Sequence, residues 1–376
     1  MIILILLLAA AILYFAEKKI YAAYWKKGLD IKVNFDEHSA FEGDTSTLTE
    51  VVENRSFLPL PFIHAKFHVG SGLLFEDREN MATSDANYKN DIFSILFFQR
   101  ITRTLKFTCT GRGFYRITDA ALVSTDLFYK LHLLDTRPLD TFFYVYPGRV
   151  DISRFEQPLR KMVGEMNSRQ FLYPDPFEFR GLRTYTISDP MNTINWKASA
   201  RMGELMVNQY DSTTTRKIVI LLNLENETVI ARDILHEESI RIACTLCGRL
   251  LSEGYPIGLR VNGRDVETLA PTPYLQAQGP AQLEDLYRTL ARIDMSEKDK
   301  PEFAPFIRDL MQEPDFNTSG YVLVSACQNE EIQEAYRELS REAAALWVSP
   351  MFMNMQPHVQ LDNDDELIRW EVEGYA

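Results

Sequence analysis

The segment KIVILLNL, residues 217–224, is the most apolar stretch of the chain after its N-terminal run. Only Lys217 and Asn223 interrupt its aliphatic side chains. A strand that is apolar on both faces is typical of a parallel sheet covered by helices on both sides. Beyond it, strand-like runs at 257–261, 321–326 and 345–349 alternate with segments of helical periodicity. We therefore predict an α/β domain over residues 217–350.

Upstream of this segment the hydrophobic pattern has a period of two. In FIHAKFHV, residues 62–69, apolar residues alternate with His64, Lys66 and His68. Several such runs separated by polar turns predict a β-sandwich-like domain over residues 31–150. His64 and His68 lack a third ligand at suitable spacing, so we interpret them as part of a solvated strand face rather than a metal site.

Composition limits the classes of function. A chain of 376 residues has room for two or three domains, and its net charge of -13 argues against nucleic-acid binding. The spacing of Cys244 and Cys247 allows a redox or metal pair. Both lie on an apolar helical face, however, so we predict buried thiols and a reducing compartment.

The N-terminus begins MIILILLLAAAILYFA, sixteen residues without a charged side chain. Lysines follow at 18, 19, 26 and 27, with aromatic residues between them that suit a membrane interface: Tyr21, Tyr24 and Trp25. We predict a single-pass membrane anchor over residues 1–27, with the bulk of the chain cytoplasmic by the positive-inside rule. A cleaved signal peptide is the alternative, although it would place basic residues ahead of the apolar run.

A connecting region, residues 151–216, contains the stretch RTYTISDPMNTINWKASARMGELMVNQY, residues 183–210. Asp189 and Pro190 predict the start of a helix that ends near Gly203. Two interpretations of this helix stay open. Trp196 fills a seam between domains while the charges pair with acidic neighbours, or Trp196 and its basic flanks form a docking surface for a partner.

This stretch resembles the signature of the bacterial "domain of unknown function 58" family. The matching residues, which are also our candidate interaction residues, are Arg183, Tyr185, Asp189, Ile194, Trp196, Lys197, Ser199 and Arg201, together with Ala200. Ser188 and Asn192 depart from the family pattern, which usually has glycine and arginine there. The resemblance extends to residues 41–62, 111–128 and 144–150, and so to most of the chain.

The resemblance implies a von Willebrand factor A-like, Rossmann-like C-terminal domain. The expected fold class is thus an α+β multidomain protein: a membrane helix, a β-sandwich-like domain and this α/β domain, ending in a tail over residues 351–376. Such domains often bind Mg²⁺ through an Asp-x-Ser-x-Ser motif. Asn223, Glu225 and Glu227 occupy those positions here, which predicts a degenerate site with no metal and no cofactor. The acidic run of the tail, residues 362–366, reads as a solvated segment.

The resemblance also implies a function, that of a membrane-anchored scaffold or adaptor. Its expected partner is a MoxR-type AAA+ ATPase, in protein-complex assembly or envelope maintenance, and a transglutaminase-like membrane protein is a second expected partner. One alternative is a hydrolase or metal-dependent enzyme with an unrecognised site. We find neither a GxSxG motif nor a P-loop, assign no catalytic residue and expect no enzyme activity. Another alternative is an extracellular adhesion module, which would need the opposite membrane orientation.

Overall fold

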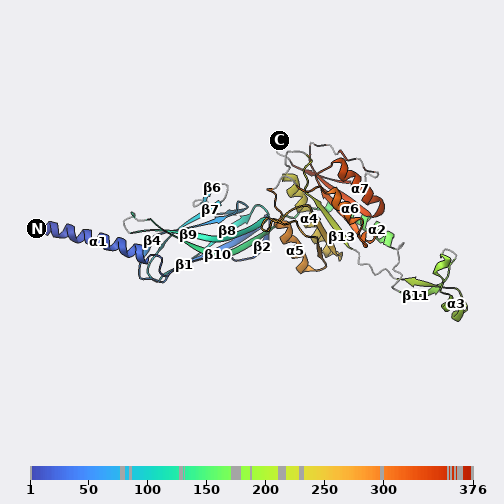
Figure 1. The fold of residues 1–376 in the computed structure, drawn as a ribbon, viewed down its shortest axis with the longest axis horizontal. Coiled ribbons are helices and arrows are strands. Elements are labelled where there is room, and N and C mark those ends of the chain that lie inside the picture. Colours follow the sequence, from blue (N-terminus) through green and yellow to red (C-terminus); the bar gives the residue numbers. More distant parts are fainter. Residues whose placement is uncertain are drawn as a thin grey trace. The chain divides into compact units, whose positions relative to one another are not determined.

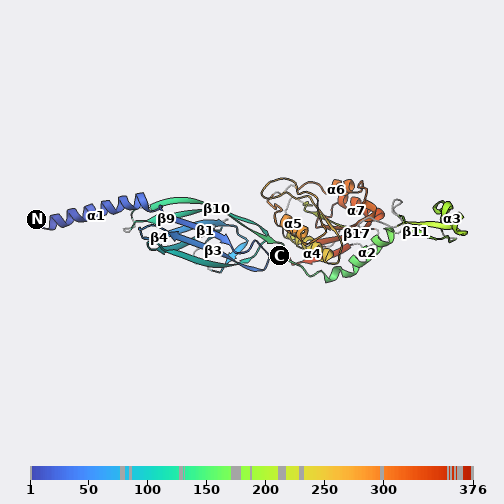
Figure 2. The ribbon, with the colours of Figure 1, turned by 90° about the horizontal axis from the view of Figure 1, so that it is seen from below.

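The computed structural model describes residues 2–76, 81–83, 87–126, 130, 132–170, 179–186, 189–210, 217–227, 233–296, 300–353, 355, 358–359, 361 and 367–373. The chain divides into two compact units, Met1–Gly148 (unit 1) and Arg149–Ala376 (unit 2), and each is described by itself (Figures 1 and 2). Ser188 and the acidic run 362–366 lie outside the described residues.

The N-terminal helix α1 spans Ile2–Tyr24. Its uncharged part, Ile2–Ala16, reaches only about 22 Å, against about 30 Å for the hydrocarbon core of a bilayer. Within the described residues no helix combines the length and the apolar character needed to cross a membrane. The predicted single-pass anchor, and the localisation inferred from it, are therefore wrong. Tyr21 and Trp25, which were expected at a membrane interface, are instead buried in the core of unit 1.

Unit 1 is built from two sheets that share one hydrophobic core. The first has the order β1-β3-β8-β5, with β1 Leu29–Phe35, β3 Thr45–Asn54, β8 Arg100–Cys109 and β5 Leu73–Phe75. The second has the order β2-β10-β9-β4-β7-β6, with β2 Ser39–Phe41, β10 His132–Tyr146, β9 Gly113–Thr125, β4 Leu60–Val69, β7 Asn87–Ile95 and β6 Met81–Thr83. The alternation predicted for residues 62–69 is confirmed, since Ile63, Ala65, Phe67 and Val69 are buried.

Four ionisable side chains meet at the edge of this core. Arg103 Nη1 donates to Asp91 Oδ1 at 2.9 Å, and Lys89 Nζ lies 3.7 Å from the same oxygen. The fourth is Glu50, which is fully buried and lies beside the Asp91 carboxyl group. Burial, followed by the nearby Asp91 carboxylate, raises the pKa of Glu50 to about 9. Glu50 is therefore protonated at neutral pH.

Unit 2 contains a six-stranded sheet of order β15-β14-β13-β16-β17-β18. The strands are β15 Leu275–Ala277, β14 Ile257–Val261, β13 Ile218–Asn223, β16 Gly320–Ser325, β17 Ala344–Phe352 and β18 Leu367–Val372. All neighbours pair in parallel except β14 and β15. Every residue of β13 and β16 is buried, because helices cover both faces.

The helices of unit 2 are α2 Glu156–Gln170, α4 Asp233–Ser252, α5 Pro280–Ala291, α6 Ala304–Leu310 and α7 Glu330–Glu342. Helices α2 and α4 contact the sheet strands, while α6 and α7 pack on each other and share a core cluster with Val219, Leu221 and Leu323 (Figures 1 and 2). Cys244 and Cys247 lie buried in α4, where burial raises the pKa of the Cys244 thiol to about 12. The prediction of buried thiols is confirmed.

The expected fold class is wrong. The protein is rich in β structure, with 40% strand against 33% helix in the described residues, and α1 is not the predicted membrane helix. The tail, for which no element was predicted, contributes the strand β18 directly after the acidic run. There β18 pairs with β17, and Trp370 Nε1 donates to Glu238 Oε1 of α4 at 2.8 Å.

Candidate functional site

The signature stretch folds as a small element that we call the signature hairpin, residues 179–210. It contains β11 Phe179–Thr184, a 3-10 turn η2 at Met191–Thr193, α3 Trp196–Met202 and β12 Met206–Tyr210. Strands β11 and β12 form an antiparallel two-stranded sheet. Two strands alone are marginally stable in water, so other interactions must hold the hairpin.

The predicted helix is shorter than expected at its start. It begins at Trp196, and Asn195 caps it by accepting the Ala198 N–H at 2.9 Å. It ends at Gly203, as predicted, because a positive φ of 76° there suits glycine. Asp189 is not a helix cap.

Asp189 instead forms a two-point ion pair with Arg183. The two guanidinium nitrogens lie 2.7 and 2.6 Å from the two carboxylate oxygens. Asp189 Oδ2 also accepts the backbone N–H and the hydroxyl of Thr186, each at 2.8 Å. Arg183, and then the Thr186 N–H, hold the pKa of Asp189 well below its usual range. This pair fixes the turn that follows β11.

A second network joins α3 to β12. Ser199 Oγ donates to the Asn195 carbonyl at 2.8 Å and accepts the Met206 N–H at 2.8 Å. Asn195 Nδ2 donates to Asn208 Oδ1 at 2.7 Å. Ile194 is buried, only 6% exposed, and forms an isolated bridge with Val207 of β12. Ser199 and Ile194 therefore have structural roles within the hairpin.

The outer surface of the hairpin exposes large apolar side chains. Trp196 is 65% exposed, Met191 70%, Met202 67% and Leu205 42%. Lys197 and Arg201 are exposed beside them on α3. We refer to these six exposed residues of the hairpin together as the Trp196 face. Trp196 is not buried within unit 2, and both interpretations of the helix stay predictions. Met191 lies in η2 and Leu205 follows α3, so neither belongs to the helix on which the sequence prediction was based.

Arg183→Lys is expected to speed hydrogen exchange of the Thr186 amide, because an ammonium group cannot hold both oxygens of Asp189 in one plane. Exchange followed by mass spectrometry on peptides covering residues 183–189 measures this. Lys197→Arg, a change on the exposed face of the same hairpin, is the matched control. Equal exchange in both variants would show that the ion pair does not order the turn.

A second candidate site lies at the carboxyl ends of β13 and β16. The chain passes from β13 to β14 on one side and later to β16 on the other, so these ends form a topological switch point, where α/β sheets usually bind ligands. Asn223 ends β13 and is fully buried. Its Nδ2 donates to Ser325 Oγ at 3.0 Å, and its Oδ1 accepts from Asn262 Nδ2 at 3.0 Å and from the Glu225 N–H at 2.9 Å.

Glu225 is held between the first turns of two helices. Its Oε2 accepts the N–H of Phe303, the N-cap of α6, at 3.1 Å. Its Oε1 accepts from the side-chain amide of Asn329, the N-cap of α7, at 3.1 Å. Burial raises the pKa of Glu225. Glu227 is exposed and lines a small pocket with Asn226, Cys327 and buried His236.

These residues do not fit a hard divalent cation. The side-chain oxygens of Asn223 and Glu225 already accept hydrogen bonds, and in the part of the chain that the structure describes no group of three or more His, Cys, Asp or Glu side chains could hold a metal. The arrangement is suited to joining β13 to α6 and α7.

Residues 181–349 match the family model described as "Protein of unknown function DUF58". This segment is a DUF58 region. It runs from β11 of the signature hairpin into β17, and so includes both candidate sites. No curated protein matches the chain.

Several solved structures resemble about a third of the chain. They include the cohesin CaCohA2 from Clostridium acetobutylicum (16% identity, 32% of this chain and 92% of that chain, TM-score 0.22). A second is a non-cellulosomal cohesin from Archaeoglobus fulgidus (13% identity, 34% of this chain and 96% of that chain, TM-score 0.22). A third is the CARDB domain of PF1109 from Pyrococcus furiosus (18% identity, 31% of this chain and 94% of that chain, TM-score 0.19). TM-scores this low assign no function.

Proposed function

We propose that the protein is an adaptor whose Trp196 face docks a MoxR-type AAA+ ATPase during the assembly of protein complexes. The observation that carries this proposal is the exposure of four large apolar side chains on a hairpin whose backbone is fixed by internal hydrogen bonds. An exposed tryptophan beside basic residues is typical of the residues that dominate binding energy at interfaces.

The fixed backbone favours binding because little conformational entropy remains to be lost on docking. The Arg183–Asp189 pair and the Ser199 hydrogen bonds order the frame before any partner arrives. The exposed Trp196 leaves the hairpin with apolar surface to bury.

Charge suggests what the partner surface looks like. The hairpin has four basic and two acidic residues, whereas the whole chain has a net charge of -13. The complementary surface is therefore an apolar pocket with an acidic rim. The resemblance to the DUF58 family supplies the class of partner, and the proposal includes no catalytic step.

Trp196→Ala is expected to weaken binding to a purified MoxR-type ATPase in its ATP-bound form by roughly thirtyfold, since truncating a central tryptophan costs about 2 kcal/mol or more. Biolayer interferometry with the full-length chain immobilised gives the two dissociation constants. Leu134→Ala in β10 of unit 1 is the control, because Leu134 is 69% exposed but lies outside the hairpin. Equal affinity for wild type and Trp196→Ala would refute the assignment of the face.

A further inference from the structure

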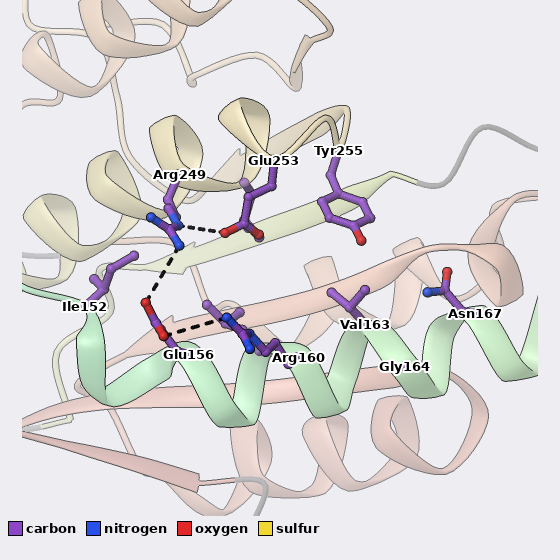
Figure 3. Close-up of a pocket in the computed structure, with 11 residues that line it drawn as sticks. Ile152, Glu156, Arg160, Val163, Gly164, Asn167, Arg249, Glu253 and Tyr255 are labelled. Carbon is purple, nitrogen blue, oxygen red and sulfur yellow. Dashed lines mark hydrogen bonds and ion pairs between the residues drawn. The ribbon is translucent and has the colours of Figure 1, made fainter.

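The groove between α2 and the end of α4 in unit 2 has a rim whose charges are already paired (Figure 3). Arg249 lies 2.7 Å from Glu253 and 3.7 Å from Glu156, and Arg160 lies 3.9 Å from Glu156. These side chains bind one another, so the rim is balanced in charge. A surface that combines excess charge with exposed aromatic rings lies in unit 1.

One end of unit 1 exposes large apolar side chains on three segments of the chain. Phe57 lies in the loop between β3 and β4 and is 64% exposed. The turn between β7 and β8 exposes Leu96, Phe97 and Phe98, and the last of these is 72% exposed. The third segment is the end of α1, where Tyr24 is exposed. We refer to these five residues together as the aromatic end of unit 1.

Hydrogen bonds join the two loops of the aromatic end. The buried Asn54 donates through Nδ2 to the Leu58 carbonyl at 2.8 Å and to the Leu96 carbonyl at 3.0 Å. The Phe98 N–H donates to the Ser56 carbonyl at 3.2 Å. The backbone that carries the exposed rings is therefore ordered before any partner arrives, and less conformational entropy is lost on binding.

The exposed apolar surface continues from these loops onto α1. The rings of Tyr24 and Phe57 contact each other, with their centroids 6.2 Å apart. Ile20 is also exposed and lies one helical turn before Tyr24, so the two side chains share a face of α1. The aromatic end is thus part of a broad apolar surface and not an isolated loop tip.

Phe98 has a backbone conformation that is unfavourable for a bulky residue. Its φ of 52° lies in the left-handed region, where glycine and asparagine are the usual residues of a tight turn between strands. Burial of the ring does not offset this strain, because most of the ring is exposed. A strained residue that presents its side chain to solvent indicates a role in binding.

The aromatic end has basic neighbours in an acidic protein. Residues 17–28, 53–59 and 96–100 contain six basic residues and two glutamates, whereas the whole chain has a net charge of -13. Two of the basic residues form ion pairs, Arg55 with Glu53 and Lys26 with Asp135. The other four form no ion pair within the part of the chain that the structure describes: Lys18, Lys19, Lys27 and Arg100. Positive charge therefore remains beside the exposed rings.

We propose that the aromatic end of unit 1 docks onto the surface of an anionic lipid bilayer. The rings enter the headgroup region, where aromatic side chains are favoured, and the neighbouring basic residues bind lipid phosphates. The contact is with the bilayer surface only, because α1 lacks the length and apolar character to cross the bilayer.

A bilayer surface is favoured over a protein partner by the breadth of the apolar surface and by its charge. Side chains on two loops and on a helix differ in height, and a fluid surface accommodates them without a matching pocket. Anionic lipids repel most of this acidic chain. The basic neighbours of the aromatic end therefore determine which part of the molecule approaches the bilayer.

Co-sedimentation of the full-length chain with lipid vesicles tests the proposal. We expect wild type to bind vesicles of phosphatidylcholine and phosphatidylglycerol in equal parts about tenfold more tightly than vesicles of phosphatidylcholine alone. Phe97→Ser combined with Phe98→Asn should weaken binding to the mixed vesicles by about tenfold or more, because two apolar rings are lost. Leu74→Ser is the matched control, since Leu74 is exposed in β5, which pairs with the end of β8 opposite to Arg100.

Thermal melts separate a loss of binding from a loss of folding. Asparagine tolerates the left-handed conformation, so Phe98→Asn alone should unfold at the same temperature as wild type or at a higher one, while its binding to the mixed vesicles falls. Lys27→Glu combined with Arg100→Glu tests the charges, and this variant should lose the preference for the mixed vesicles.

Three results would overturn the proposal. The first is a wild type that binds neither kind of vesicle, which would leave a protein as the occupant of this surface. The second is equal binding of wild type to both kinds of vesicle, and the third is unchanged binding in the variant that lacks Phe97 and Phe98. Binding through α1 alone would be common to all samples and would give the third result.

Discussion

Glu50→Gln is expected to make unit 1 more stable than wild type at neutral pH, by an amount that grows as pH rises. The buried glutamate keeps its proton in the folded state, where its pKa is about 9, and loses it in the unfolded chain near the usual value of 4.5. The stability contributed by this group is therefore fully present below about pH 4.5 and is lost as pH rises toward 9.

The expected magnitude follows from the difference of one bound proton between the two states. The free energy of unfolding of wild type should fall, relative to Glu50→Gln, by about 1.4 kcal/mol per pH unit, or roughly 4 kcal/mol between about pH 5 and about pH 8. A glutamine side chain fits the same volume and has no proton to lose, so its stability lacks this slope.

Hydrogen exchange of the amides of β3 and β7, corrected for the intrinsic effect of pH, measures the stability of unit 1 in the full-length chain. Glu53→Gln is the matched control, because Glu53 lies on the same strand but pairs with Arg55 at the surface, which lowers its pKa. Parallel curves for wild type and Glu50→Gln would mean that Glu50 is ionised in the fold and balanced by Lys89 and Arg103.

The hydrophobic pattern of the sequence predicted strands whose residues are all buried or are buried alternately. The run at 217–224 contains β13, and the alternation at 62–69 lies within β4, because a strand in a covered sheet must be apolar on both faces and one in a sandwich on a single face. The same reasoning failed at α1. Tyr21 and Trp25 have the composition of a membrane interface, yet Tyr21 Oη donates to the Pro59 carbonyl at 2.7 Å and both rings are buried.

The sequence predicted where the candidate sites lie, but not which hydrogen bonds and ion pairs their side chains form. Asp189 precedes Pro190, a combination typical of a helix N-cap. In the structure its carboxylate instead binds Arg183 across the turn. Asn223 and Glu225 were identified as degenerate positions. Their partners Asn262 and Asn329 are 39 and 104 residues distant, and no short-range rule connects them.

Asn223→Asp, which restores the carboxylate that a metal-binding sequence would have, is expected to destabilise unit 2 by about 2–4 kcal/mol at neutral pH. The amide Nδ2 now donates to Ser325 Oγ, whose own proton is directed to the Cys327 carbonyl at 2.8 Å. An oxygen at that position would face another acceptor, in a fully buried site near the half-buried Glu225.

Excess Mg²⁺ is expected to restore little of this stability. A cation stabilises a fold only to the extent that it binds the native state. Both carboxylate oxygens of Glu225 already accept hydrogen bonds, from Phe303 and Asn329, so few ligands are left for Mg²⁺. Thermal melts of both proteins with and without Mg²⁺ measure the effect, with Asn192→Asp on the exposed part of the signature hairpin as the control. A large Mg²⁺-dependent rise in Tm confined to Asn223→Asp would contradict this expectation. It would show that Glu225 can leave its hydrogen bonds to α6 and α7, and that a single added carboxylate is enough to make a metal site at this switch point.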